Sequence, residues 1–170
     1  MHNGQRDDSM KVKFILLIFI TSIVGCVSVK IPTTTIEKAK NVSFKAPAAP
    51  FKSARSLGAD EMWTSATTAS TISFFTSCSN SEPALKTIRA TAFSSLEGME
   101  VTKEEFVNIN ARQGLKSIIE GRLEGVPVKI QFLVFKKNSC SYHLSYVALK
   151  ENFEKELSFF NTFINNFRVP

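Results

Sequence analysis

Histidine, cysteine, tryptophan and tyrosine are scarce in this chain, and their scarcity limits the chemistry it can perform. Its 170 residues include two His, three Cys, one Trp and two Tyr, which leaves little material for a metal centre or an activated nucleophile. A zinc site needs several His, Cys or carboxylate ligands together, and no spacing of these residues in the sequence supplies them. With seven Gly and six Pro, the chain is also not a collagen-like or Gly- and Pro-dominated repeat protein.

The few candidates for catalysis stand apart from one another. His143 alternates with Tyr142 and Leu144 in a strand-like stretch, which favours a structural place on the face of a sheet. A Ser-His-Asp set that uses His143 is formally possible, but neither a nucleophile elbow nor a Gly-rich loop accompanies it. Glu104 and Glu105 are consecutive strand residues whose side chains point to opposite faces, so they cannot work as a pair. The sequence therefore predicts no enzyme and no catalytic, cofactor-binding or metal-binding residues.

Apolar residues, by contrast, are plentiful, and Phe is prominent among them. The chain has 15 Phe, 44% hydrophobic residues and 21% charged residues, which is an ordinary globular composition. Its length supports one domain with an attached tail and not two full cores. The single Trp, Trp63, either packs in this Phe-rich core or stacks on a ligand, and its surroundings favour packing.

A basic and apolar segment near the amino terminus has the pattern of a secretory signal. Lys11 and Lys13 precede an apolar run, and the stretch from Phe14 to Val29 contains 16 uncharged residues. A membrane-spanning helix needs about 20 apolar residues, so this segment is short for a span and fits a signal peptide. Met10 directly precedes the basic pair and is a candidate for the true start of translation.

The apolar run ends in Ile23-Val24-Gly25-Cys26, which resembles the lipobox of bacterial lipoproteins. The resemblance implies that residues 1–25 are removed and that Cys26 carries acyl chains, such as palmitate, that attach the protein to a membrane. Two or three acyl chains give stable anchoring, whereas a single chain holds a protein only marginally. The alternative is a buried Cys at the end of an uncleaved anchor helix.

The residue after the lipobox Cys bears on the compartment. Val27 stands where an Asp would retain an enterobacterial lipoprotein at the inner membrane. The resemblance therefore implies a lipid-anchored protein of the bacterial cell envelope that faces the periplasm, with the outer membrane favoured over the inner.

Positive charge is concentrated in residues 26–59. This stretch has six Lys and Arg residues and one Glu, while residues 60–170 carry 12 basic and 12 acidic residues. Together with its Pro-, Thr- and Ala-rich composition, this predicts a basic, flexible tether over residues 26–59, with Phe44 and Phe51 able to dock back onto the domain. The charges either add attraction to an anionic surface, roughly 1 kcal/mol each before screening, or only keep the tether soluble.

After Asp60, the spacing of apolar residues divides the chain into strands and helices. The patterns predict strands at 62–66, 70–77, 99–109, 115–124, 126–137 and 140–149. Two amphipathic stripes predict helices, one from the Ser79–Pro83 capping cluster to Gly98 and one that Asn152 opens. The stretch 126–137 is apolar on both faces, which requires cover on both sides of a sheet.

This order, ββαββββα, predicts a single α+β domain over residues 60–170, in which an antiparallel sheet carries two helices. Short turns force antiparallel neighbours, and the apolar residues on both faces favour one helix on each side, an α-β-α sandwich. The domain resembles the PsbP-like α-β-α sandwich class of small bacterial lipoproteins. The residues that carry this resemblance are Trp63, Thr71-Ile72-Ser73, Cys78, the stretch Gly121–Val128 and the Phe-spaced terminal helix. This class includes accessory and assembly proteins of membrane complexes and many members of unknown role, and the resemblance carries over no functional residue.

Two cysteines remain once Cys26 is taken by lipid. Export places Cys78 and Cys140 in an oxidising compartment, where paired Cys commonly cross-link. Cys78 closes the second predicted strand and Cys140 opens the last, so neighbouring strand ends can bring them together. The sequence predicts a disulfide between them, and the alternative is two separate buried thiols that act as small hydrophobic side chains.

These observations support two hypotheses of function. The first is a non-enzymatic, lipid-anchored periplasmic domain that binds or helps to assemble an envelope protein partner. The second is a lipoprotein that holds a small ligand or lipid in a pocket between a helix and the sheet. No nucleic acid is expected as a partner, because the basic charge lies in the tether and not on the folded domain. The sequence specifies no oligomeric state.

Overall fold

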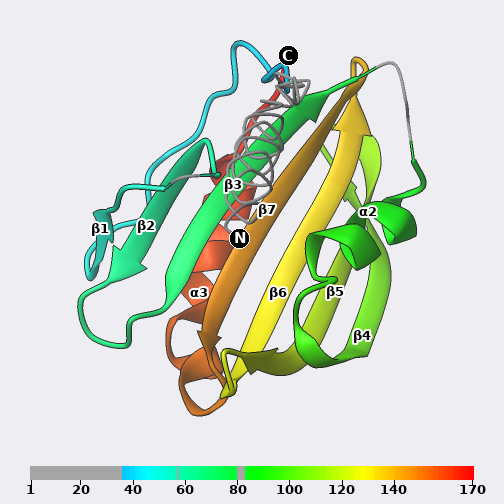
Figure 1. The fold of residues 1–170 in the computed structure, drawn as a ribbon. Helices are drawn as coiled ribbons and strands as arrows, with labels where there is room; N and C mark the ends of the chain where they lie inside the picture. The colour runs from blue at the N-terminus through cyan, green and yellow to red at the C-terminus, as the bar shows by residue number, and fades with distance from the viewer. Residues whose placement is uncertain (1–35, 57, 80–82) are drawn as a thin grey trace, which may run out of the picture. The chain divides into compact units, whose positions relative to one another are not determined.

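In the described residues, seven antiparallel strands form one sheet, and a helix lies on each of its two faces (Figure 1). This structure is a computed structural model that describes residues 36–56, 58–79 and 83–170, so the predicted signal segment, Cys26 and Val27 lie outside the described residues. The strands are β1 (Phe51–Ser53), β2 (Glu61–Ser65), β3 (Thr71–Cys78), β4 (Glu97–Ile109), β5 (Arg112–Leu123), β6 (Val126–Lys137) and β7 (Cys140–Leu149). The helices are α2 (Leu85–Ala92) and α3 (Phe153–Asn166), and the 3-10 turn η1 (Lys150–Asn152) precedes α3. The predicted α+β sandwich is confirmed, with β1 as an additional strand.

The strand order across the sheet is β1-β2-β3-β7-β6-β5-β4, and its two faces separate two cores. The α3-side core includes Phe153, Phe160 and Phe163 of α3, and the α2-side core includes Ile88 of α2. In β3, every second residue from Ile72 to Thr76 is buried, and Ile72 belongs to the α3-side core. Strand β6 is buried on both faces, as its continuous apolar run predicted, since Leu133 belongs to the α3-side core and Val134 to the α2-side core. Alternation along each strand therefore decides which core a side chain enters.

Helix α2 is shorter than the sequence predicted. It ends at Ala92 instead of near Gly98, and its N-cap is Ala84, which makes no side-chain capping hydrogen bond. Leu96 falls within the range predicted for this helix, but it lies after the helix and is buried in the α2-side core. Gly121 of β5 leaves room for it, because a Cβ atom there would lie only 2.6 Å from Leu96 Cγ. A tertiary contact thus takes Leu96 away from the helix.

The globular unit begins before Asp60, the residue at which the sequence patterns predicted its start. Residues 36–59 belong to the same unit as the sheet, and β1 pairs with β2 in antiparallel register. Phe51 is only 5% exposed, and Phe44 packs among aromatic rings of the α3-side core at centroid distances of 5.0 to 6.5 Å. The part of the predicted tether that the structure describes is therefore fastened to the domain by two Phe side chains.

Candidate functional site

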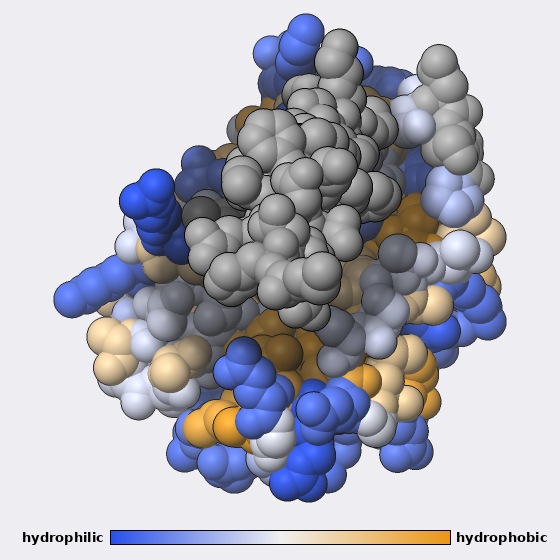
Figure 2. Space-filling model, in the orientation of Figure 1, coloured by the Kyte–Doolittle hydropathy of each residue, from blue (hydrophilic) through white to orange (hydrophobic). Residues whose placement is uncertain are grey.

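A groove lies on the α2 face of the sheet because α2 is too short to cover that face. The helix has eight residues and packs on β5 and β6, so within the described residues it leaves the same face of β3 and β7 uncovered. The groove has a volume of about 620 Å³, and its lining comes from Ile36, β3, β7, β6 and α2. Figure 2 shows hydrophobic surface on this face between hydrophilic margins. We call this space the α2 groove.

Three rows of side chains form the floor of the α2 groove. The rows pair β3 with β7 and alternate between hydroxyl and ring side chains: Ser73 with Ser145, Phe75 with His143, and Ser77 with Ser141. In the first row the two hydroxyl groups hydrogen-bond to each other at 2.8 Å, and in the second the two rings meet edge to face at 5.4 Å. The floor thus presents rings in its middle and hydroxyl groups on either side.

The wall of the groove comes from α2 and from the residue that follows it. Thr87, Ile88 and Thr91 line the groove from the helix, and Phe93 lines it just beyond the helix end. Phe93 packs edge to face on Phe132 of β6, with ring centroids 4.9 Å apart. The wall is therefore mainly apolar and carries two threonine side chains.

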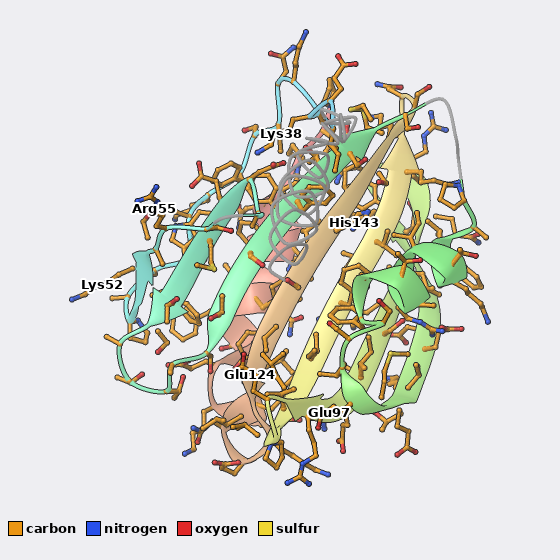
Figure 3. All side chains as sticks on the ribbon, in the orientation of Figure 1. Lys38, Lys52, Arg55, Glu97, Glu124 and His143 are labelled. Carbon is orange, nitrogen blue, oxygen red and sulfur yellow. A yellow bond between two sulfur atoms is a disulfide. The ribbon has the colours of Figure 1, made fainter. Side chains whose placement is uncertain are left out.

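His143 is a floor residue of the groove, and its surroundings make it a poor general base (Figure 3). Its ring lies edge to face with Phe75 and with Phe132, at centroid distances of 5.4 and 5.9 Å. Burial lowers the pKa of His143 to about 4, although the negative charge of Asp60 opposes the shift. The imidazole is therefore neutral near pH 7, and its pKa lies well below the range that suits a base at that pH.

The hydroxyl of Ser141 has a second partner besides His143. Ser141 Oγ donates to the carbonyl oxygen of Ser77 at 3.3 Å and lies 2.9 Å from His143 Nε2. While the hydroxyl donates its one proton to that carbonyl, the bond to His143 requires the imidazole tautomer with a proton on Nε2. A serine nucleophile needs an imidazole that accepts its proton. His143 is thus a sheet-face residue, as its strand pattern indicated.

Cys78 and Cys140 form a disulfide beside the groove. They are a direct register pair between β3 and β7, their sulfur atoms are 2.00 Å apart, and 62 positions separate them in the chain. Cys140 also lines the groove. The bond therefore links the two strands whose side chains make the floor.

The other residues that the sequence analysis weighed lie away from the groove floor. Trp63 is 5% exposed in the α3-side core, so it packs and does not stack on a ligand. Glu104 pairs with Lys86 of α2, while Glu105 pairs with Lys116 of β5, and each partner lowers the pKa of its carboxyl group. The two carboxylates serve separate ion pairs.

A buried carboxylate that the sequence analysis missed joins α3 to the turn between β2 and β3. Glu156 is 5% exposed and accepts hydrogen bonds from Ser65 Oγ at 2.8 Å, Thr67 Oγ1 at 2.8 Å and Thr68 Oγ1 at 2.5 Å. Burial acts to raise its pKa, but these hydroxyl donors outweigh that effect and the pKa is lowered. The available signal was a single Glu within the apolar face of the terminal helix and a turn rich in Ser and Thr.

The lining of the groove defines the contacts that it can make with a ligand. It combines apolar side chains and rings, hydroxyl groups, the neutral imidazole of His143 and the amine of Lys136. Among the residues that the structure describes, no group of His, Cys, Asp and Glu side chains could hold a metal ion. In the same part of the chain, neither α2 nor α3 combines the length and the apolar composition needed to cross a bilayer.

Comparison with known proteins gives structural neighbours but no family. No family model and no curated protein matches the chain. LpqN of Mycobacterium tuberculosis, described as involved in cell envelope biogenesis, is 12% identical over 76% of this chain and 83% of its own, with a TM-score of 0.59. The cyanobacterial PsbP protein CyanoP of Synechocystis is 10% identical over 87% of this chain and 99% of its own, with a TM-score of 0.57. A Bacteroides thetaiotaomicron protein is 12% identical over 80% of this chain and 47% of its own, with a TM-score of 0.54.

These identities are low, so the likeness shows the fold alone. The match to CyanoP covers nearly all of that chain and confirms that this domain has a PsbP-like fold. The sheet with a helix on each face is the shared feature.

Proposed function

We propose that this protein is a lipid-anchored binding protein of the bacterial cell envelope, without catalytic activity, and that the α2 groove holds its ligand. The α2 groove is the observation that supports this proposal. Its volume of about 620 Å³ lies within the range of about 300–1,000 Å³ that is usual for small-molecule sites. Apolar rings in the middle of the floor, with hydroxyl rows on either side, suit an amphipathic molecule whose apolar part lies on the rings.

Lipid attachment at Cys26 provides the anchor in this proposal. The stretch Ile23–Cys26 resembles a lipobox behind a basic and apolar segment, and Val27 favours the outer membrane, with the domain facing the periplasm. The structural neighbour that is described as involved in cell envelope biogenesis is in keeping with this location. Cys26→Ala should abolish palmitate labelling and release the protein from membranes or leave it as a precursor. Labelling that persists in the variant would contradict the anchor.

Ligand binding can be tested with a fluorescent fatty acid as the probe and lipid-free protein as the receptor. Thr91→Trp places a large side chain in the groove from α2, whereas Ala90→Trp makes the same change at an exposed position outside the lining. We expect wild type and Ala90→Trp to bind the probe with similar Kd, and Thr91→Trp to bind at least tenfold more weakly. Native mass spectrometry of protein purified from membranes should show a bound small molecule in the first two proteins.

Two results would refute the groove as a binding site. One is the absence of probe binding and of any co-purified molecule in the wild type. The other is equal loss of binding in both Trp variants, which would show that the change acts through folding and not through the space it fills.

An envelope protein partner is the second candidate, and a different surface favours it. Leu123 and Val126 flank the β5–β6 turn and are 51% and 45% exposed, and Phe106 on the edge strand β4 is 57% exposed. A photo-crosslinking residue at Leu123 should then capture one specific envelope protein in cells. The same residue at Arg112, which is exposed at the β4–β5 end, is the matched control. Identical, non-specific products at both positions would remove this candidate.

A further inference from the structure

We propose that the domain docks onto an anionic phospholipid surface through a basic edge, defined by Lys38, Lys40, Lys45, Lys52 and Arg55. All five side chains are exposed. Lys52 and Arg55 lie in and just past β1, the outermost strand of the sheet, whereas Lys38 and Lys40 flank Ala39, whose backbone bonds to Thr76 near the end of β3. The inference rests on the proposed anchor at Cys26, because that anchor would bring this edge to the membrane.

The charge of the basic edge is largely uncompensated. Between residues 36 and 59, Glu37 is the only acidic residue beside these five cations. Lys38 pairs with Asp60 at 2.7 Å, and in the described ranges no ion pair is found for the other four cations. Their charge is therefore available to an external anionic surface.

The basic edge is also held in place, unlike charges on a free tether. Lys52 lies in β1, which pairs with β2, and the neighbouring Phe51 is buried in the α3-side core. The same segment is fixed at Ser43, whose backbone exchanges two hydrogen bonds with Arg168 at 2.9 and 2.7 Å. Arg168 is exposed and adds a further cation beside the edge. A charged surface that is already ordered loses less conformational freedom on binding than a flexible segment does.

The opposite edge of the sheet has no comparable excess of positive charge, because Glu104 and Glu105 of β4 offset the charges of Lys86, Arg89 and Lys116 in ion pairs. Strand β4 contains four glutamates and one lysine: Glu97, Glu100, Glu104, Glu105 and Lys103. Figure 3 shows Lys52 and Arg55 on the β1 side of the sheet, whereas Glu97 and Glu124 lie at the lower end of the sheet in this view. An anionic surface would therefore attract the β1 edge more strongly than the β4 edge.

The chain length between the proposed anchor and the domain allows this contact. Residues 26–35 span at most about 35 Å when fully extended, at roughly 3.5 Å per residue. Surface charges act over a Debye length of about 8 Å at physiological salt, so an attached domain samples the range in which they attract. In this orientation the sheet stands edge-on to the membrane, and the α2 groove opens sideways and not into the bilayer.

The proposal can be tested on the full, lipidated chain reconstituted in vesicles of phosphatidylcholine alone or of phosphatidylcholine with 30% phosphatidylglycerol. Acetylation of lysine amines, followed by mass spectrometry, reports which side chains the surface covers. We expect acetylation of Lys40, Lys45 and Lys52 to be at least threefold slower on the anionic vesicles, and the difference to vanish in 0.5 M salt. Lys86 and Lys103, at the β4 side, should react equally on both vesicles.

A matched pair of triple variants separates position from net charge. Lys45→Gln, Lys52→Gln and Arg55→Gln together should remove the protection of Lys40. The control combines Lys86→Gln, Lys103→Gln and Lys150→Gln, which remove the same charge at other positions. In this control, Lys40 should stay protected from acetylation. Equal reactivity on both vesicle types, or equal loss of protection in both triples, would overturn the basic edge. Release of the wild type from all vesicles in high salt would instead refute the lipid anchor, so the two failures are distinguishable.

Discussion

Removal of the Cys78–Cys140 disulfide should destabilise the domain by one shared increment, whichever cysteine is replaced. The bond spans a separation of 62 residues, for which the chain-entropy model gives about 4 kcal/mol. Both cysteines are half-buried and stand at the paired ends of β3 and β7, so a serine in either place removes little besides the bond. We expect Cys78→Ser and Cys140→Ser each to lower the free energy of unfolding by about 4 kcal/mol, and the double variant by little more.

Urea unfolding of lipid-free protein measures this increment, with Cys26→Ala in every protein so that no third thiol interferes. Trp63 is a suitable reporter, because it is the single Trp of the chain and is buried in the α3-side core. Reductant is the control, since it should bring the wild type to the level of the variants and leave the double variant unchanged. Costs that add in the double variant would refute the shared bond, and so would two labelled thiols per wild-type chain after denaturation without reductant.

Four further variants probe the α3-side core, the groove and the buried carboxylate. Phe51→Ala should lower the free energy of unfolding by about 3–5 kcal/mol, because the side chain is 5% exposed. A chain that starts at Asp60 should likewise unfold at a lower urea concentration than one that starts at residue 36. A urea midpoint equal to that of the unchanged protein would contradict either prediction. Acidification should weaken the wild type, because His143 titrates near 6.5 when unfolded and near 4 when folded, so the unfolded chain binds the additional proton in this window. The free energy of unfolding at pH 7 should fall by about 3 kcal/mol as the pH is lowered from 6.5 to 4. In urea midpoints measured across pH 4 to 7, His143→Asn should remove this pH dependence. A pH dependence that is unchanged in the variant would assign it to other groups. Glu156→Gln should lower the free energy of unfolding by about 1–3 kcal/mol in thermal melts, since the amide cannot accept all the hydroxyl donors that the carboxylate accepts, and an unchanged Tm would show that they find other partners.

The strands from β2 to β7 could be predicted because their signals are local. Alternation marks β3, a continuous apolar run marks β6, and Gly125 supplies the positive φ of 79° that the short β5–β6 turn requires. Antiparallel pairing follows from turns of this length, since each strand must return beside the one before it. The register, and with it the side-chain pairs on each face, then follows from which residues are apolar.

Strand β1, the partners of Glu156 and the α2 groove could not be predicted, because they depend on contacts between residues far apart in the chain. Strand β1 has three residues, too few to show a period, and Phe51 is buried partly by Phe159 of α3, with ring centroids 5.6 Å apart. The turn hydroxyls that bind Glu156 lie about 90 positions before it. The α2 groove arises for the same reason, because Leu96 leaves the helical stripe for a place on the sheet and the helix stops short.

The place of β7 between β3 and β6 has a consequence for how the chain folds when its amino-terminal part becomes available first. When a chain emerges with its amino terminus first, β1, β2 and β3 can pair with one another, but the other edge of β3 has no partner until β7 follows. Ser43 must likewise wait for Arg168, almost at the end of the sequence. The pairing of β3 with β7 therefore forms late, which favours slow folding and leaves a strand edge open to other chains in the meantime.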